Sequence, residues 1–220
     1  MKYPSAKLIV FSKAPIAGQV KTRLAKITGD ESAVKIHEHL VRHCLKIATS
    51  ANLAPVELWC SPSQGHAFFQ QCRREFTIQL KEQGEGNLGQ RMSRAFLNGL
   101  SDADCVVLIG TDCPVMTEEN LAHAFSLLEN GDVTVIGPAE DGGYVLLGMS
   151  QYQASLFENI PWGTERVLNE TCDKLDGDYG LLPVLWDVDY HEDLQRLISA
   201  KLNLEKEFQN FLQDFSLRQD

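Results

Sequence analysis

The chain has 220 residues, and its 20 Lys and Arg residues against 30 Asp and Glu residues give a formal net charge of -10. This acidic balance argues against nonspecific binding to nucleic acid or to an anionic membrane, because both need a broad basic surface. The hydrophobic content of 44% is ample for one sizeable core, so we expect a single domain over residues 1–220.

The six cysteines are scattered and form no C-x-x-C pair, which indicates reduced, buried thiols in a cytoplasmic protein and no zinc site. The apolar segment near the N-terminus is too short for a signal peptide, and no apolar run has the length needed to span a bilayer. A homodimer is an open alternative to a monomer.

Apolar runs and helical periodicity divide the chain into alternating strands and helices. The strands are expected at 8–11, 56–60, 76–80, 105–109, 133–136, 144–148 and 181–186. The helices are expected at 30–51, 87–100, 117–128, 151–157, 164–174 and, as a pair, 192–215, with a short one near residue 71. This alternation predicts right-handed βαβ units, and the glycine-linked strands near Asp141 predict mixed pairing towards one edge. We therefore expect an α/β fold, a three-layer α/β/α sandwich with a mostly parallel mixed sheet.

The stretch DADCVVLIGTDCP centres on an apolar run, Cys105 to Ile109, that reads as a central strand buried on both faces. Thr111 and Asp112 follow it, at the sheet edge where ligands bind in open α/β folds. Asp112 is therefore a candidate for holding a cation or a substrate hydroxyl. The alternative is a turn aspartate that caps the next helix, but Thr117 already supplies that cap.

The first strand ends in SKAPIAGQVKTRL, a loop that carries Lys13, Lys21 and Arg23 and is broken by Gly18. A basic loop between a strand and a helix is the usual place for a phosphate cradle. It matches neither the P-loop pattern nor the G-x-G-x-x-G fingerprint. The alternative is a solvated basic loop, and its place at the strand end favours phosphate binding.

Three further stretches fall at predicted strand ends. QGEGNLGQRM holds Gln83, Gly89 and Arg91, where the Gln83 amide can pair with a base edge, although such a turn is also ordinary loop chemistry.

Asp187 and Asp189 come after the late strand as D-x-D. This pattern resembles the nucleophile motif of haloacid-dehalogenase-type phosphatases, but the residues after it depart from that motif. A metal ligand that reaches across to Asp112 fits better. Helix capping by Asp189 or Asp193 is the alternative.

The turn PAEDGGY places Asp141, Gly142 and Gly143 near the same edge. Asp141 can bind an acceptor hydroxyl or act as a general base, although D-G is also the strongest turn dipeptide. Trp162 belongs either to a substrate-side lip or to a packed aromatic corner. The histidines at positions 37, 39 and 43 share a helix without a third metal ligand, and we interpret them as surface or packing residues.

Together, FSKAPIAGQVKTRL, QGEGNLGQRM, GTDCP, PAEDGGYVLLG, IPWGT and DVDYHEDL resemble, in order and spacing, the bacterial family of radical-SAM/selenodomain-associated transferase 1. The resemblance spans about residues 8–197. It implies the nucleotide-diphospho-sugar transferase (glycosyltransferase A) fold, whose relatives include nucleotidyltransferases.

The resemblance also implies roles for individual residues. Asp112 matches the metal-binding aspartate, with Gly110 in place of the first acid of a D-x-D site, and Asp189 matches the late metal ligand. Lys13, Gly18, Lys21 and Arg23 match the phosphate cradle of the first loop, and Gln83 with Gly89 matches the base-contacting segment. Together with Arg91 and Thr111 at the same edge, these are the expected nucleotide-binding residues. From their position in the turns at that edge, we expect Asp141, Gly142, Gly143 and Trp162 to bind the substrate, and we expect Lys21, Arg23 and Asp141 to be catalytic.

These assignments predict a transferase that uses Mg²⁺ or Mn²⁺ on Asp112 and Asp189 and takes its donor from a nucleotide or nucleotide sugar. The expected activity is glycosyl transfer to an unidentified small-molecule acceptor. The alternatives are a nucleotidyltransferase that uses an NTP and releases pyrophosphate, and a noncatalytic nucleotide-binding module. The sequence leaves open whether Asp187 or Asp189 is the late ligand, and it leaves open the base, the sugar and the acceptor.

Overall fold

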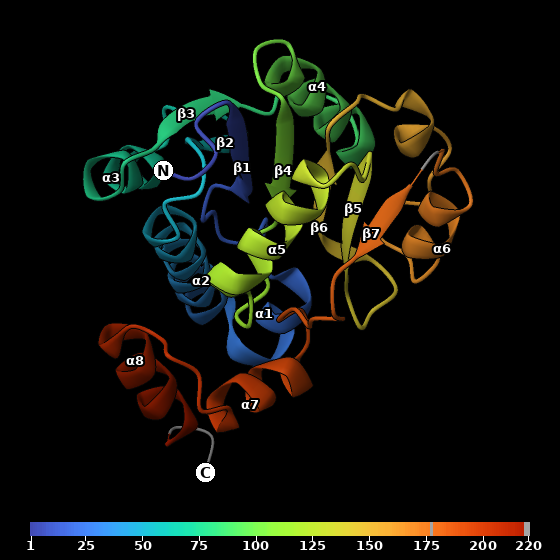
Figure 1. Cartoon of the computed structure of the whole chain (residues 1–220). Helices are drawn as coiled ribbons and strands as arrows, with labels where there is room; N and C mark the ends of the chain where they lie inside the picture. Colours follow the sequence, from blue (N-terminus) through green and yellow to red (C-terminus); the bar gives the residue numbers. More distant parts are fainter. Residues whose placement is uncertain (177, 218–220) are drawn as a thin grey trace.

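The computed structural model describes residues 1–176 and 178–217. Seven strands form one sheet in the order β3-β2-β1-β4-β6-β5-β7 (Figure 1). Their bounds are β1 (Ala6–Lys13), β2 (Val56–Ser61), β3 (Gln79–Glu82), β4 (Cys105–Ile109), β5 (Thr134–Pro138), β6 (Tyr144–Met149) and β7 (Tyr179–Leu181). Strand β6 pairs antiparallel with both β4 and β5, whereas the other pairs are parallel. The expected mostly parallel mixed sheet is confirmed.

Helices cover both faces of this sheet. Their bounds are α1 (Thr22–Thr28), α2 (Asp30–Ser50), α3 (Ala67–Glu75), α4 (Leu88–Leu100), α5 (Glu118–Glu129), α6 (Val167–Cys172), α7 (His191–Ser199) and α8 (Lys206–Ser216), with a 3₁₀ turn, η1 (Ala154–Phe157). One core cluster joins the sheet to α2, α3 and α5, and a second joins the other face to α4 and η1. The three-layer arrangement follows from these two cores.

Successive residues of β1 enter opposite cores, because side chains alternate across a strand. Leu8 and Val10 lie in the cluster with α2, whereas Ile9 and Phe11 lie in the cluster with α4. Leu8, Ile9 and Val10 are fully buried. An unbroken apolar run is therefore what this central strand requires.

A third cluster ties the end of the chain to its beginning. Apolar residues of α7 and α8 pack with Leu24 of α1 and with Ile36 and Leu40 of α2. Trp186 and Val188, in the segment that precedes α7, lie in the same cluster. This packing brings the late D-x-D segment next to the loop after β1.

The late strand differs from the prediction of 181–186, because β7 covers Tyr179–Leu181 and shares one residue with that range. Pro183 lacks an amide hydrogen and interrupts the ladder. Beyond it, the Leu185 amide donates to the Pro138 carbonyl at 2.9 Å, and Leu185 forms an isolated bridge with Ala139. The chain thus stays beside β5 and delivers Asp187 to the carboxyl edge of the sheet.

Strand β3 and helix α1 also differ from expectation. Strand β3 begins at Gln79, because Phe76 ends α3 as its C-cap. Helix α1 begins at Thr22, inside a stretch that the sequence predicts to be a loop, and its N-cap Lys21 offers no side-chain cap from which a start could be read.

Within the described part of the chain, no helix combines the length and the apolar character that a membrane crossing demands.

The parallel strands end at one edge of the sheet, at the bottom of Figure 1. The loop after β1, helix α1, the β5–β6 turn and α7 all lie at this edge. Because β6 runs in the opposite direction, it begins where β5 ends. Loops from the beginning, the middle and the end of the chain therefore meet there.

Candidate active site

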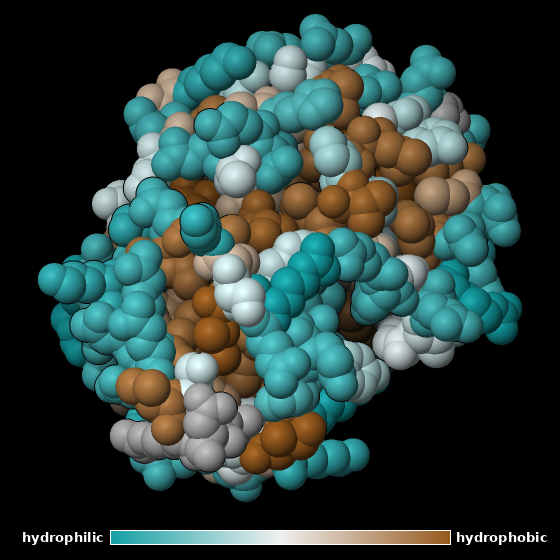
Figure 2. Space-filling view, turned by 90° about the horizontal axis from the view of Figure 1, so that it is seen from below, coloured by the Kyte–Doolittle hydropathy of each residue, from teal (hydrophilic) through white to brown (hydrophobic). Residues whose placement is uncertain are grey.

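A cavity of about 590 Å³ opens at this edge. Its lining includes four basic side chains and four carboxylates: Lys13, Lys21, Arg23, Arg91, Asp112, Asp141, Asp187 and Asp189. Figure 2 views the molecule from this side and shows hydrophobic residues across the middle of the face, between hydrophilic rims. The cavity is thus balanced in charge, although the whole chain carries a formal charge of -10.

Apolar and aromatic side chains form the remaining wall, among them Phe11, Leu88, Met92, Leu108, Tyr144, Leu147, Trp162 and Val167. The Trp162 ring meets the Tyr144 ring edge-on, with 6.4 Å between centroids. A Cβ placed on Gly89 would lie 2.5 Å from Trp162 Nε1. Gly89 therefore lets the indole lie against the start of α4, whereas Gly89 itself does not line the cavity.

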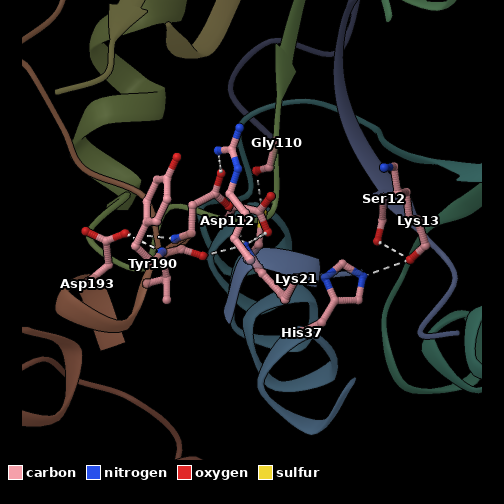
Figure 3. Close-up of polar contacts among 12 residues, drawn as sticks. Ser12, Lys13, Lys21, His37, Gly110, Asp112, Tyr190 and Asp193 are labelled. Carbon is pink, nitrogen blue, oxygen red and sulfur yellow. Dashed lines mark hydrogen bonds and ion pairs between the residues drawn. The ribbon is translucent and has the colours of Figure 1, made fainter. Parts of the chain in front are cut away.

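Lys21 is the link between the first loop and the acidic residues. Its side chain is only 3% exposed, and Nζ lies 2.6 Å from Asp112 Oδ1 and 3.3 Å from Asp189 Oδ1 (Figure 3). Nζ also donates to the Val188 carbonyl at 2.6 Å. Burial alone would lower the pKa of this ammonium, but the two carboxylates outweigh it and raise the pKa.

Asp112 lies directly after β4, as expected, and Thr117 is the N-cap of α5. Burial alone would raise the pKa of Asp112, but Lys21, and after it His37, lowers the pKa below its ordinary value. Asp112 Oδ1 accepts no hydrogen bond of good geometry from the described residues, and its partner is the Lys21 ammonium in an ion pair. This oxygen can therefore accept a different cation.

Asp189 is held by α7 and faces the first loop. Asp193 Oδ2 accepts the amides of Asp189 at 3.0 Å and Tyr190 at 2.7 Å. Arg23 Nη1 lies 3.3 Å from Asp189 Oδ2, and the Arg23 guanidinium stacks over the Tyr190 ring at 5.0 Å. The capping alternative thus applies to Asp193 and leaves the Asp189 carboxylate turned towards Lys21 and Arg23.

Asp187 differs from Asp189 in its electrostatic surroundings. Burial first, and then the charges of Asp141 and Asp189, raise the pKa of Asp187 to about 7. Asp141 accepts the Gly143 amide through Oδ1 at 2.8 Å, which shapes the β5–β6 turn. Asp187 and Asp189 both line the cavity, and Asp189 is the one that shares the Lys21 ammonium with Asp112.

Gln83 lines the cavity, but its amide is engaged by the protein. Nε2 donates to the Trp59 carbonyl at 2.8 Å and to the Ser12 carbonyl at 3.1 Å, while Oε1 accepts from Arg91 Nη1 at 3.2 Å. Gln83 is only 3% exposed. In this arrangement, Gln83 fixes the ends of β1 and β2 and positions Arg91, and its amide is not free to read a base edge.

Gly18 and Gly142 do not line the cavity, and backbone geometry accounts for both. Gly18 has φ +74° in open space. Gly142 has φ +85°, and a Cβ there would lie 2.1 Å from the Glu165 carbonyl oxygen. Its own carbonyl accepts the Leu168 amide at 2.8 Å. Gly142 therefore joins the turn to the start of α6.

Two histidines of α2 support the edge, a role that the sequence pattern does not predict. His37 Nε2 bonds to the Lys13 carbonyl at 2.9 Å, and His43 Nε2 bonds to the Pro114 carbonyl at 3.1 Å. Both rings are buried, and burial lowers the pKa of each. His37 also lines the cavity. Both positions belong to the buried side of α2, so the apolar periodicity of this helix was the available signal for their burial.

The carboxylate oxygens of Asp112 and Asp189 suit a divalent cation whose remaining ligands come from outside the protein. Among the residues that the structure describes, no group of three or more His, Cys, Asp or Glu side chains is arranged to hold a metal ion. Asp112 and Asp189 nevertheless face one point. Mg²⁺ commonly uses one or two carboxylates and completes its shell with phosphate oxygens and water.

Comparison with solved structures identifies the fold. A protein from Desulfovibrio desulfuricans G20, provisionally described as a nucleotide-diphospho-sugar transferase, matches with a TM-score of 0.85 at 28% identity over 98% of each chain. A cytidylyltransferase from Leptospira borgpetersenii matches with a TM-score of 0.59 at 15% identity over 99% of this chain and 96% of that one. The inositol-1-phosphate CTP transferase from T. maritima matches with a TM-score of 0.59 at 12% identity over 97% of this chain and 98% of that one.

The fold is therefore that of the nucleotide-diphospho-sugar transferase class, of glycosyltransferase A type. Residues 44–164, more than half of the chain, match the family described as uncharacterized protein conserved in bacteria (DUF2064), and the chain belongs to this family. No curated protein matches the sequence.

Proposed function

We propose that the protein is a metal-dependent transferase that takes its donor from a nucleotide sugar. The observation that carries this proposal is the meeting of Asp112 and Asp189 at one buried cation, beside the basic loop after β1 and inside one cavity. The description of the D. desulfuricans neighbour supports the same donor class. The finer assignment to the radical-SAM/selenodomain-associated transferase 1 group belongs to this proposal as well.

Basic residues of the cavity bind the donor in this proposal. Lys13, Lys21 and Arg23 stabilise the negative charge that develops on the leaving phosphates, and Arg91 and Thr111 contact the nucleotide. A bound Mg²⁺ or Mn²⁺ on Asp112 and Asp189 would neutralise charge on those phosphates. Gly18, Gly89 and Gly142 act through the shape of the backbone around the site.

In this proposal, the acceptor binds beside the β5–β6 turn. Asp141 lies in the β5–β6 turn and orients the attacking hydroxyl, for which it can also accept the proton. Gly143 and Trp162 border the same region. Displacement at the anomeric carbon then breaks its bond to the diphosphate oxygen and releases a nucleoside diphosphate.

Nucleotidyl transfer is a second candidate, favoured by the three cations of the first loop, a number suited to a triphosphate. In that reaction, a phosphorylated acceptor attacks the α-phosphate of an NTP, and pyrophosphate leaves. The structure pairs both Lys21 and Arg23 with Asp189. Both candidates need this pairing to open when phosphate binds, and the description of the D. desulfuricans neighbour favours the nucleotide-sugar donor.

A thermal-shift panel of nucleoside diphosphates, nucleoside triphosphates and nucleotide sugars, each with and without Mn²⁺, tests the proposal. We expect a nucleotide sugar to raise the melting temperature only with Mn²⁺, and Asp112→Asn to abolish this metal-dependent shift. Stabilisation by an NTP, followed by release of pyrophosphate, selects the second candidate. Unchanged affinity in Asp112→Asn, without turnover of any donor, indicates a noncatalytic nucleotide-binding module.

A further inference from the structure

Lys21 already occupies the point at which the two proposed metal ligands meet. The side chains of Asp112 and Asp189 are 44% and 35% exposed, whereas the Lys21 side chain between them is 3% exposed. Together with the Val188 carbonyl, the two carboxylates give the ammonium three oxygen partners. The arrangement is that of an internal cation site.

The backbone at Lys21 shows how firmly this position is set. Lys21 has φ +46° and ψ +40°, the left-handed conformation that residues other than glycine rarely adopt. Such a conformation costs free energy and persists where surrounding contacts determine it. The turn directs the side chain away from the solvent-exposed loop and into the space between the two acidic segments (Figure 3).

A divalent ion ligated by both carboxylates needs the same volume. Mg²⁺ lies about 2.1 Å from its oxygen ligands. The Lys21 ammonium lies 2.6 Å from one of these oxygens and 3.3 Å from the other. The ion and the ammonium therefore cannot both sit between Asp112 and Asp189, and their charges repel each other.

We infer that Lys21 is an internal counter-cation that keeps the place between Asp112 and Asp189 in the metal-free protein and has to leave it before a divalent ion binds there. The inference rests on the proposed function to the extent that these two aspartates are taken as metal ligands. Once displaced, Lys21 needs another anion, and the donor's phosphates supply it. Metal and donor phosphates therefore bind with positive coupling, and the metal alone binds weakly.

Titration of the full chain with Mn²⁺ alone, followed by electron paramagnetic resonance of the free ion, tests this inference. Lys21→Met removes the competing charge and keeps the length of the side chain. We expect it to bind Mn²⁺ at least about tenfold more tightly than the unmodified protein. Mn²⁺ binding to Lys21→Met that is no tighter than to the unmodified protein overturns the inference.

Lys13→Met is the matched control. Lys13 carries the same charge and lines the same cavity, but it is exposed and lies outside the ion pairs of Asp112 and Asp189. Its replacement should change Mn²⁺ affinity by less than about threefold. An equal gain in both variants would mean that cavity charge alone sets metal affinity, and the inference would be wrong.

A second measurement uses the unmodified protein and so does not depend on the folding of a variant. In a sample with ¹⁵N-labelled lysine, the enclosed Lys21 ammonium should give an NMR signal whose protons exchange slowly with water. The signal is assigned to Lys21 by its absence from the Lys21→Arg variant. Titration with Mg²⁺ and inorganic pyrophosphate together should move or remove this signal. A signal that stays unchanged at saturation overturns the inference.

The two proposals fail separately. If Lys21→Met gains Mn²⁺ affinity but no nucleotide sugar stabilises any form of the protein, Lys21 competes with the metal and the donor assignment is wrong. If a nucleotide sugar and Mn²⁺ stabilise the protein but Lys21→Met gains no affinity for Mn²⁺ alone, the donor assignment stands and Lys21 acts only on phosphate.

Discussion

Gly142 and Gly163 have nearly the same backbone conformation in different surroundings. Their φ values are +85° and +82°, but a Cβ at Gly142 would lie 2.1 Å from the Glu165 carbonyl oxygen. A Cβ at Gly163 would meet no atom of the described residues within 4 Å, apart from those of Gly163 and its two chain neighbours. Gly163→Ala should therefore cost only the left-handed conformation, about 1–2 kcal/mol of unfolding free energy. Gly142→Ala should cost about 2 kcal/mol more, since backbone has to shift as well.

Urea unfolding of the two alanine variants measures this difference. Both variants lose the same free energy to the left-handed conformation. The difference between their unfolding free energies therefore isolates the steric conflict between the turn and the start of α6. Equal losses in the two variants would show that the turn moves freely away from Glu165, and the structural role given to Gly142 would then be incorrect.

Asp187 predicts a pH dependence of stability in metal-free protein. Its pKa is raised to about 7 in the folded state, above the ordinary value of 3.8, so the folded state binds a proton more tightly. This contribution is complete below pH 4 and is lost as the pH rises to 7. Between pH 5 and pH 8, the unmodified protein should therefore lose about 1–2 kcal/mol relative to Asp187→Asn.

Unfolding free energies in EDTA at several pH values test this prediction. Asp141→Asn serves as the companion variant, because removal of the neighbouring charge should shrink the pH dependence without abolishing it. A constant difference between the unmodified protein and Asp187→Asn from pH 5 to pH 8 would contradict the assigned shift.

Individual site residues were predictable when their position followed from a strand end. Asp112 lies after β4 because an apolar run ends there, and Asp189 lies where the late segment reaches the same edge. The partners of these residues were not predictable. That Lys21 is buried between two acids, and that the Gln83 amide serves the protein's own carbonyls, depends on packing between segments distant in sequence.

At the level of elements, α7 holds two segments that line the cavity, the D-x-D segment and the β5–β6 turn. Asp193 accepts the amides of Asp189 and Tyr190. One turn later, Arg196 forms a two-pronged pair with Glu140, with contacts of 2.7 and 3.1 Å, and stacks over Trp186 at 4.3 Å. A single helix thus fixes both the D-x-D segment and the turn that carries Asp141.

Loss of this clamp should loosen the β5–β6 turn. In Arg196→Met, amide hydrogen exchange over residues 139–143 should become about fivefold faster, because the pair with Glu140 no longer restrains the turn. Arg196→Lys should show an intermediate rate, since lysine keeps the charge but not the two-pronged geometry. Hydrogen exchange with mass spectrometry gives the rates.

Arg42→Met is the matched control for Arg196→Met. Arg42 of α2 also pairs with a glutamate of another helix, Glu75 of α3, and stacks over an aromatic ring, that of Phe68. Its replacement should leave exchange in residues 139–143 unchanged. If both variants accelerate exchange equally, or neither does, the turn is held by its backbone hydrogen bonds and α7 has no such role.

Elements with a complete local signal were predicted well. Strand β4 has the expected bounds of 105–109, and α5 begins after its Thr117 cap. Helix α1 was not predicted, because its N-cap is the left-handed Lys21 without a side-chain cap. The late strand was misplaced because Pro183 breaks the ladder inside an apolar run, whereas pairing with β5 continues on both sides of it.

At the level of the whole molecule, the site depends on residues that are far apart in the chain. The cations lie between residues 13 and 23, Asp112 lies in the middle, and Asp189 precedes the last two helices. The sequence order of the motifs predicted this convergence, because parallel strands all end at one edge. We therefore expect these separate loops to unfold together with the sheet.

Donor and metal should consequently stabilise the entire chain. With donor and metal each at about one hundred times its dissociation constant, the unfolding free energy should rise by about 5.4 kcal/mol, about 2.7 kcal/mol for each ligand, in a single calorimetric transition. Two transitions, of which the ligands shift only one, would show that the late helices unfold independently of the sheet. The apo protein scanned in EDTA is the reference.

Under the proposed function, the reversed direction of β6 has a consequence for how the acceptor side of the site can diversify. Residues 139–143 form a local hairpin connection, whereas the basic loop and Asp112 come after parallel strands whose order fixes the sheet. Mutations that lengthen or rewrite this hairpin alter the wall assigned to the acceptor and leave the donor half intact. Evolution can thus exchange one co-substrate while inheriting the other.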